Sequence, residues 1–188
     1  MPTDKDKGTS IYNRDTMEFL TVAKQFCTFV ESTEGMKREL FVNTMLKLLP
    51  LLYLKAIMLD KVEHDEDVYP ETFVTEDSYE VVRINIASIM GELDDYLDVF
   101  MEDMVYSDKP ILSTISENIA DIYQDIRDMV FSFQLEYEES RKEALATCID
   151  NFDTIWGQKL VNVMRALHSA RHSVHECDDE NCGCHDND

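Results

Sequence analysis

The chain has 188 residues, 44% of them hydrophobic and 30% charged, which is enough apolar surface for one folded domain and excludes a disordered chain. Five Gly and four Pro are too few for the many tight turns of an all-β fold. The net charge of −22 disfavours nucleic acids and anionic membrane surfaces as partners, and the most apolar run, residues 48–54, is too short to span a bilayer.

The N-terminal sequence MPTDKDKGTS has no apolar segment of the kind found in secretory signals. We therefore predict a cytoplasmic protein with a flexible N-terminus at residues 1–10. Thiols stay reduced in the cytoplasm, so the five Cys are predicted to be core residues or metal ligands and not disulfides.

The first two helices are predicted from apolar residues at helical spacing. Residues 11–32 form the first helix, and Gly35 marks its end. Residues 36–59 form the second, which is apolar on nearly every side and is therefore predicted to be the buried, central helix. Pro50 lies in its middle and cannot donate a backbone hydrogen bond, so we expect a kink or break there.

Residues 60–75 are predicted to form a linker, because the segment is acidic and has no helical period. His64 lies in its acidic run and is predicted to be exposed, with a pKa raised by neighbouring carboxylates. The third helix is predicted at residues 76–106, followed by a turn at residues 107–110. Its apolar stripe consists of Val82, Ile86, Ile89, Leu93, Leu97, Phe100 and Met104.

The fourth helix, predicted at residues 111–138, has the most regular apolar pattern, with spacings that alternate between three and four. This heptad seam is typical of helices that pack at a shallow angle, and it consists of Leu112, Ile115, Ile119, Ile122, Ile126, Met129 and Phe133. The fifth helix is predicted at residues 140–170, where Gly157 is expected to admit a close neighbour beside Trp156. Together the segments predict an all-α, up-and-down bundle of about five long helices over residues 11–171.

Enzyme-like patterns are scarce in the predicted bundle. A carboxylate-bridged di-metal site needs Glu-x-x-His, which does not occur in the chain, and no Gly-rich phosphate loop is present. Cys27 and Cys148 are predicted core residues, and Lys159 is expected to extend its amine to solvent. The acids of the third and fourth helices are predicted to be solvated, namely Glu92, Asp94, Asp95, Asp98, Glu102, Glu117, Asp121, Asp125 and Asp128.

The tail, residues 172–188, is the one stretch that points to specific chemistry. Four of the five His and three of the five Cys lie in the last 21 residues, and imidazole and thiolate ligands suit Zn²⁺, Ni²⁺, Co²⁺ or Cu(I). If the fifth helix continues, three of these His share one face. The predicted metal ligands are His168, His172, His175, Cys177, Cys182, Cys184 and His185.

The spacing of these ligands predicts a flexible chelating tail and not a zinc finger, because paired Cys-x-x-Cys units are lacking. Two alternatives remain open. A disordered tail can bind metal incidentally, or the tail has a thiol redox role or no chemistry at all.

Three segments are informative as a set, namely FLTVAKQFCTFVE at residues 19–31, LKLLPLLYLKA at residues 46–56 and WGQKLVNVMRALH at residues 156–168. Together they resemble an uncharacterised bacterial family of helical proteins, one of the domains of unknown function. The resemblance covers residues 11–170 and leaves the tail outside. It implies a helical bundle in a bacterial cytoplasm, and it transfers no functional residues because the family has no established activity.

The leading functional hypothesis is a non-enzymatic helical binding or adaptor protein, with an unknown protein partner and a metal-chelating tail. A second hypothesis is an acidic interaction module that binds a cationic partner without metal. A third is an enzyme with an unrecognised site, which a deep pocket with perturbed titratable groups would favour.

Overall fold

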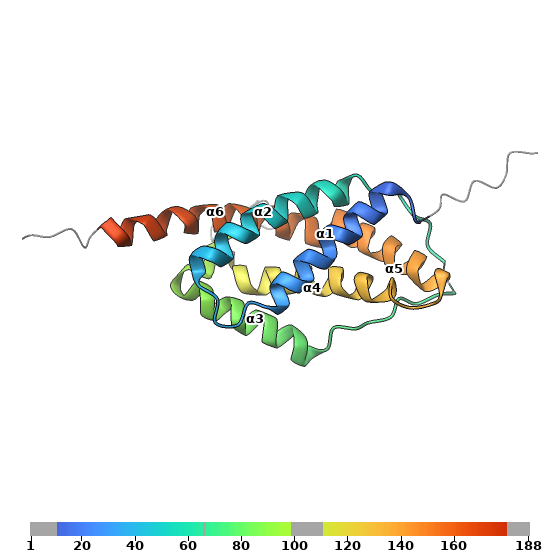
Figure 1. The fold of residues 1–188 in the computed structure, drawn as a ribbon, viewed down its shortest axis with the longest axis horizontal. Coiled ribbons are helices and arrows are strands. Elements are labelled where there is room, and N and C mark those ends of the chain that lie inside the picture. The colour runs from blue at the N-terminus through green and yellow to red at the C-terminus, as the bar shows by residue number, and fades with distance from the viewer. Residues whose placement is uncertain (1–10, 66, 99–110, 180–188) are drawn as a thin grey trace, which may run out of the picture.

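The computed structural model describes residues 11–65, 67–98 and 111–179, with side chains up to position 172. It is a bundle of long helices (Figure 1). The helices are α1 (Arg14–Glu31), α2 (Arg38–Ile57), α3 (Glu76–Met90), α4 (Ile115–Ser132), α5 (Glu138–Asn151) and α6 (Gly157–Asp179). A π-helical turn, η3 (Phe152–Trp156), joins α5 to α6 without a break, so the all-α class and the five long helical segments are confirmed.

Helix α4 occupies the centre of the bundle and packs against α1, α3, α5 and α6. Its predicted seam is correct along the helix itself, since Ile115, Ile119, Ile122 and Ile126 are fully or almost fully buried. The side chain of Thr114 caps the helix by accepting a hydrogen bond from the Glu117 amide. The helix with the most regular heptad pattern is therefore the central one, a position that the sequence predicted for residues 36–59.

Helix α2 is not the central helix that its composition predicted. It packs against α1 and α6 and leaves its opposite side open to solvent, where Leu40 is 57% exposed and Leu54 is 51% exposed. By length and composition α2 alone among the described helices could cross a membrane, although a third of its most apolar window is buried in the bundle. The helix also runs unbroken through Pro50, so no break occurs there.

The third helix is shorter than predicted. Helix α3 ends at Met90 because Gly91 adopts a φ of 56°, a left-handed conformation that glycine tolerates best. A 3₁₀ turn, η1 (Gly91–Leu93), and a strand, β1 (Asp95–Leu97), follow. This strand pairs antiparallel with β2 (Leu112–Thr114), so Leu97 and Leu112 lie in a short exposed ribbon and not on helices.

The turn η3 explains why the residue that follows Trp156, the only tryptophan in the chain, is a glycine, Gly157. A Cβ atom at position 157 would lie 2.4 Å from the carbonyl oxygen of Phe152 and 3.1 Å from its ring. The extra residue in the π turn brings this carbonyl against Gly157, and the indole nitrogen of Trp156 donates to the Cys148 carbonyl oxygen at 3.0 Å. The predicted close neighbour of Gly157 is thus Phe152.

Candidate functional site

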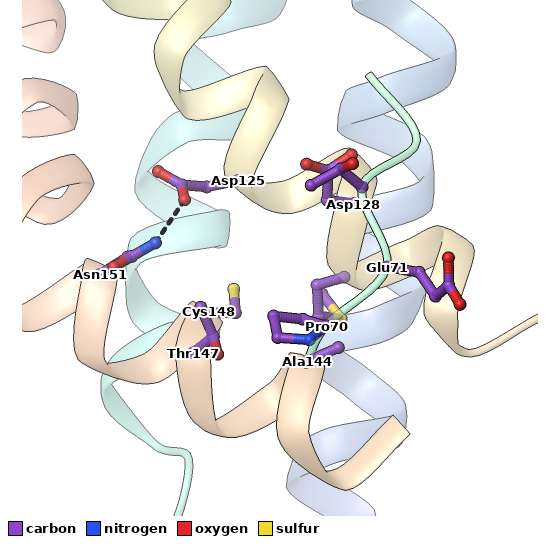
Figure 2. A pocket seen from close by; sticks show the side chains of 10 residues that line it. Pro70, Glu71, Asp125, Asp128, Ala144, Thr147, Cys148 and Asn151 are labelled. Carbon is purple, nitrogen blue, oxygen red and sulfur yellow. Dashed lines mark hydrogen bonds between the residues drawn. The ribbon is translucent and has the colours of Figure 1, made fainter. Parts of the chain in front are cut away.

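A small pocket lies where the linker between α2 and α3 crosses α4 and α5 (Figure 2). Its volume is about 200 Å³, below the usual range of ligand sites. Apolar atoms dominate its wall, and the lining residues are Pro70, Glu71, Thr72, Asp125, Asp128, Met129, Ala144, Thr147, Cys148 and Asn151.

The two aspartates of this pocket are already engaged by the protein. Asp128 accepts hydrogen bonds from the amides of Phe73 and Val74, both at 2.7 Å, and so fixes the linker to α4. Asp125 accepts one from the side-chain amide of Asn151 at 2.6 Å, as Figure 2 shows. Burial raises the pKa of each carboxyl, and these hydrogen bonds partly offset the effect. The prediction that these aspartates are solvated is therefore wrong.

The thiol of Cys148 is not an activated nucleophile. Cys148 is 2% exposed, and burial raises its pKa well above the usual value, so the thiol stays protonated at neutral pH. Burial likewise raises the pKa of Cys27 to about 12. No His is among the residues that line the pocket, so a Cys–His pair of the kind used in covalent catalysis does not form there.

The linker is also held by His64, which the sequence placed among its own acidic neighbours. The imidazole lies between two carboxylates of α5, 2.7 Å from Glu143 and 2.9 Å from Asp150. Hydrogen bonding to Glu143, and next to Asp150, raises the pKa of His64. The predicted direction of the shift is confirmed, but its sources are residues about 80 positions away and not the acidic run.

Asp94 is a buried acid that the sequence pattern placed in solvent. It is 9% exposed and binds the first turn of α4, where its carboxylate accepts hydrogen bonds from the Ser116 amide at 2.8 Å and hydroxyl at 2.6 Å. Its role is structural, because it joins the segment after α3 to the start of α4. Lys159 likewise has a partner, since its amine forms an ion pair with Asp121 at partly exposed positions.

The predicted metal ligands begin on the exposed end of α6. Helix α6 continues to Asp179, nine residues past the predicted end, so the helical backbone required for the His cluster is present. His168 and His172 are exposed neighbours one turn apart, with ring centroids separated by 5.0 Å. The side chains of the other five predicted ligands, His175, Cys177, Cys182, Cys184 and His185, lie outside the described residues.

Two further observations bear on this pair. Within the part of the chain that the structure describes, no three His, Cys, Asp or Glu side chains gather into a metal-binding group. His168 also lines an open groove of about 490 Å³ between α2 and α6, together with Arg165 and Arg171. Any metal ion at the pair therefore needs further, negatively charged ligands to balance these arginines.

The comparisons with known proteins extend over nearly the whole bundle. A family model described as a domain of unknown function, DUF5063, matches residues 10–173. The chain belongs to the DUF5063 family. The predicted resemblance to a family of this kind over residues 11–170 is thereby confirmed, and the DUF5063 match ends before the Cys-containing tail.

A solved structure supports the DUF5063 assignment. The crystal structure of protein BF1032 from Bacteroides fragilis, a structural-genomics target, is 52% identical to this chain and has a TM-score of 0.77. The alignment covers 87% of this chain and 96% of that one. No curated protein matches the chain. The family thus defines the fold and leaves the function open.

Proposed function

We propose that this chain is a non-enzymatic binding protein of the bacterial cytoplasm, whose C-terminal helix and tail hold a transition-metal ion. The single observation that carries the proposal is the position of His168 and His172, which lie one turn apart at the exposed end of α6 with ring centroids 5.0 Å apart. Two imidazoles at this spacing can reach one ion and occupy two of its four tetrahedral positions.

The tail sequence supplies the ligand types that complete such a site. Cys177, Cys182 and Cys184 offer thiolates, and His175 and His185 offer imidazoles. The tail is also acidic at positions 176 and 178–180, and this charge raises the local concentration of cations. This mixture of imidazole and thiolate favours Zn²⁺ over Mg²⁺ or Ca²⁺.

The proposal is tested with tag-free, full-length protein purified without chelators. Elemental analysis and calorimetric titration with Zn²⁺ are expected to give about one ion per chain. The variant His168→Ala/His172→Ala is expected to bind Zn²⁺ about tenfold or more weakly, because two ligands are lost. The variant Cys177→Ser/Cys182→Ser/Cys184→Ser is expected to lose affinity as well.

The matched control is His64→Gln, which removes the one histidine outside the predicted metal ligands and leaves the sequence of α6 unchanged. Its Zn²⁺ affinity is expected to equal that of the unchanged protein. Unaltered Zn²⁺ binding in the two cluster variants would overturn the proposal, and so would the absence of Zn²⁺ binding in the full-length protein.

A further inference from the structure

The outer side of α2 carries four exposed apolar side chains on one face. Leu51 is 38% exposed, Leu54 51%, Met58 43% and Leu40 57%. With Lys47 these residues follow one another at spacings of seven, four, three and four, so they lie on one face of the helix, opposite the buried Met45, Leu49 and Leu52. We call this set, Leu40, Lys47, Leu51, Leu54 and Met58, the outer α2 stripe.

The stripe lies in a stretch that is free of acidic residues. The whole chain has 39 acids among 188 residues, yet residues 40–59 contain no Asp or Glu. They contain two lysines, and one of these, Lys55, is paired with Glu18 at 2.5 Å. Lys47 is therefore the only charged residue of the stripe, on a molecule whose net charge is −22.

This charge pattern discriminates between classes of partner. A cationic partner would be attracted to acids, and the stripe has none. An anionic partner needs several cations, and the stripe supplies one. A second copy of this strongly acidic chain is a partner that explains the absence of acids from this stretch, because like charges across an interface between two copies repel each other.

We propose that the outer α2 stripe is the contact between two copies of this chain. A two-fold symmetric contact requires a surface that complements itself. An apolar stripe with a single charge meets this requirement. The geometry favours antiparallel helices, because parallel helices would bring the two Lys47 side chains together. With the axis near residue 49, Leu40 of one copy meets Met58 of the other, and Lys47 meets Leu51.

The experiment is sedimentation equilibrium of the full-length protein over a range of concentrations, at low and high NaCl. The mass is expected to rise from 21.9 kDa towards twice that value. Dimer formation is expected to strengthen with salt, since screening weakens the repulsion between the copies. The variant Leu51→Glu/Leu54→Glu is expected to weaken the dimer by about tenfold or more.

The matched control is Val81→Glu/Ile84→Glu on α3, where the two side chains are 58% and 54% exposed. It adds the same two charges at equally exposed apolar positions outside the stripe and is expected to leave the dimer intact. The circular dichroism spectra of both variants should match the spectrum of the unchanged protein, because the substituted positions are exposed.

A charge-pair exchange tests the antiparallel arrangement. Leu40→Glu alone and Met58→Lys alone are each expected to weaken the dimer. The double variant is expected to regain part of the lost affinity, because the two new charges of opposite sign face each other across the axis. Parallel helices would give no recovery, and this result would overturn the orientation.

Three outcomes would overturn the proposal itself. The protein could remain a monomer at every concentration and salt. It could dimerise with equal strength in Leu51→Glu/Leu54→Glu, which places the contact elsewhere. It could also stay monomeric in solution and bind vesicles of mixed zwitterionic and anionic lipid through Leu51 and Leu54, which assigns the stripe to a membrane surface.

Discussion

At the scale of single residues, His64 is one of the side chains that hold the linker in place. Its imidazole joins residues 60–75 to two carboxylates of α5, and Glu143 is buried with an 8% exposed side chain while the imidazole is 42% exposed. The Asp65 amide also donates to Glu143 at 2.9 Å. The linker that covers the pocket is thus attached to α5 at one end and, through Asp128, to α4 at the other.

The pKa of His64 gives this attachment a pH dependence. Because the folded-state pKa is raised above the ordinary histidine value of about 6.5, the stabilisation is fully present below about pH 6.5 and is lost as the pH rises through the folded pKa. We expect the difference in urea midpoint between the unchanged protein and His64→Gln to be larger at about pH 6 than at about pH 8.5.

The same pair of urea unfolding curves, recorded with His172→Gln in the presence of EDTA, is the control for this prediction. His172 is exposed and its ring contacts His168 on α6, so its loss leaves the linker attached and should change the midpoint much less than His64→Gln does at about pH 6. A midpoint difference for His64→Gln that grows with pH would contradict the assignment.

At the scale of elements, the junction of α5 and α6 is held in a π turn by the absence of a side chain at position 157. Gly157→Ala is expected to destabilise the protein by about 1–3 kcal/mol, because the clash with the Phe152 carbonyl outweighs the roughly 1 kcal/mol that Ala gains over Gly in a helix. The free energy of unfolding in urea measures this effect.

Ser169→Ala, on the exposed side of α6, is the matched control and should change the free energy of unfolding by less than about 0.5 kcal/mol. A Gly157→Ala variant that is as stable as the unchanged protein would show that the turn tolerates a Cβ atom.

The elements that the sequence predicted correctly are those whose determinants are local. The seam from Ile115 to Met129 repeats along α4, and the pairing of His168 with His172 needs only one helical turn. The end of α3 was missed because Leu93 and Leu97 continue its spacing, although Gly91 stops the helix. Apolar composition also made α2 appear central, since periodicity does not show which apolar faces find a partner.

The candidate site was less predictable, because its contacts join distant parts of the chain. Asp128 binds amides 54 and 55 positions away, and His64 meets Glu143 79 positions away. No spacing rule links such residues. The tail ligands remain a prediction, since five of the seven lie outside the part of the chain whose side chains are described.

At the scale of the whole molecule, the net charge of −22 opposes the compact folded state. Repulsion among exposed carboxylates destabilises the compact state, and salt screens it. We expect the urea midpoint to rise when NaCl is raised from about 50 mM to about 500 mM. The measurement is made on the Leu51→Glu/Leu54→Glu variant, because dimer formation then contributes little to the urea midpoint.

KCl should have the same effect as NaCl at equal concentration, because screening depends on ionic strength and not on the identity of the monovalent cation. A midpoint that falls with salt would mean that attractive ion pairs, such as Lys55–Glu18, outweigh the general repulsion.

The burial of Trp156 gives the molecule an internal optical reporter. It is the only tryptophan in the chain, it is fully buried, and its indole N–H is bonded to a carbonyl oxygen next to the π turn. Intrinsic fluorescence excited at the indole band therefore comes from one known position. Loosening of the junction between α5 and α6 would shift that emission towards the red while the helices elsewhere keep their ellipticity, so light alone can separate a local opening from global unfolding.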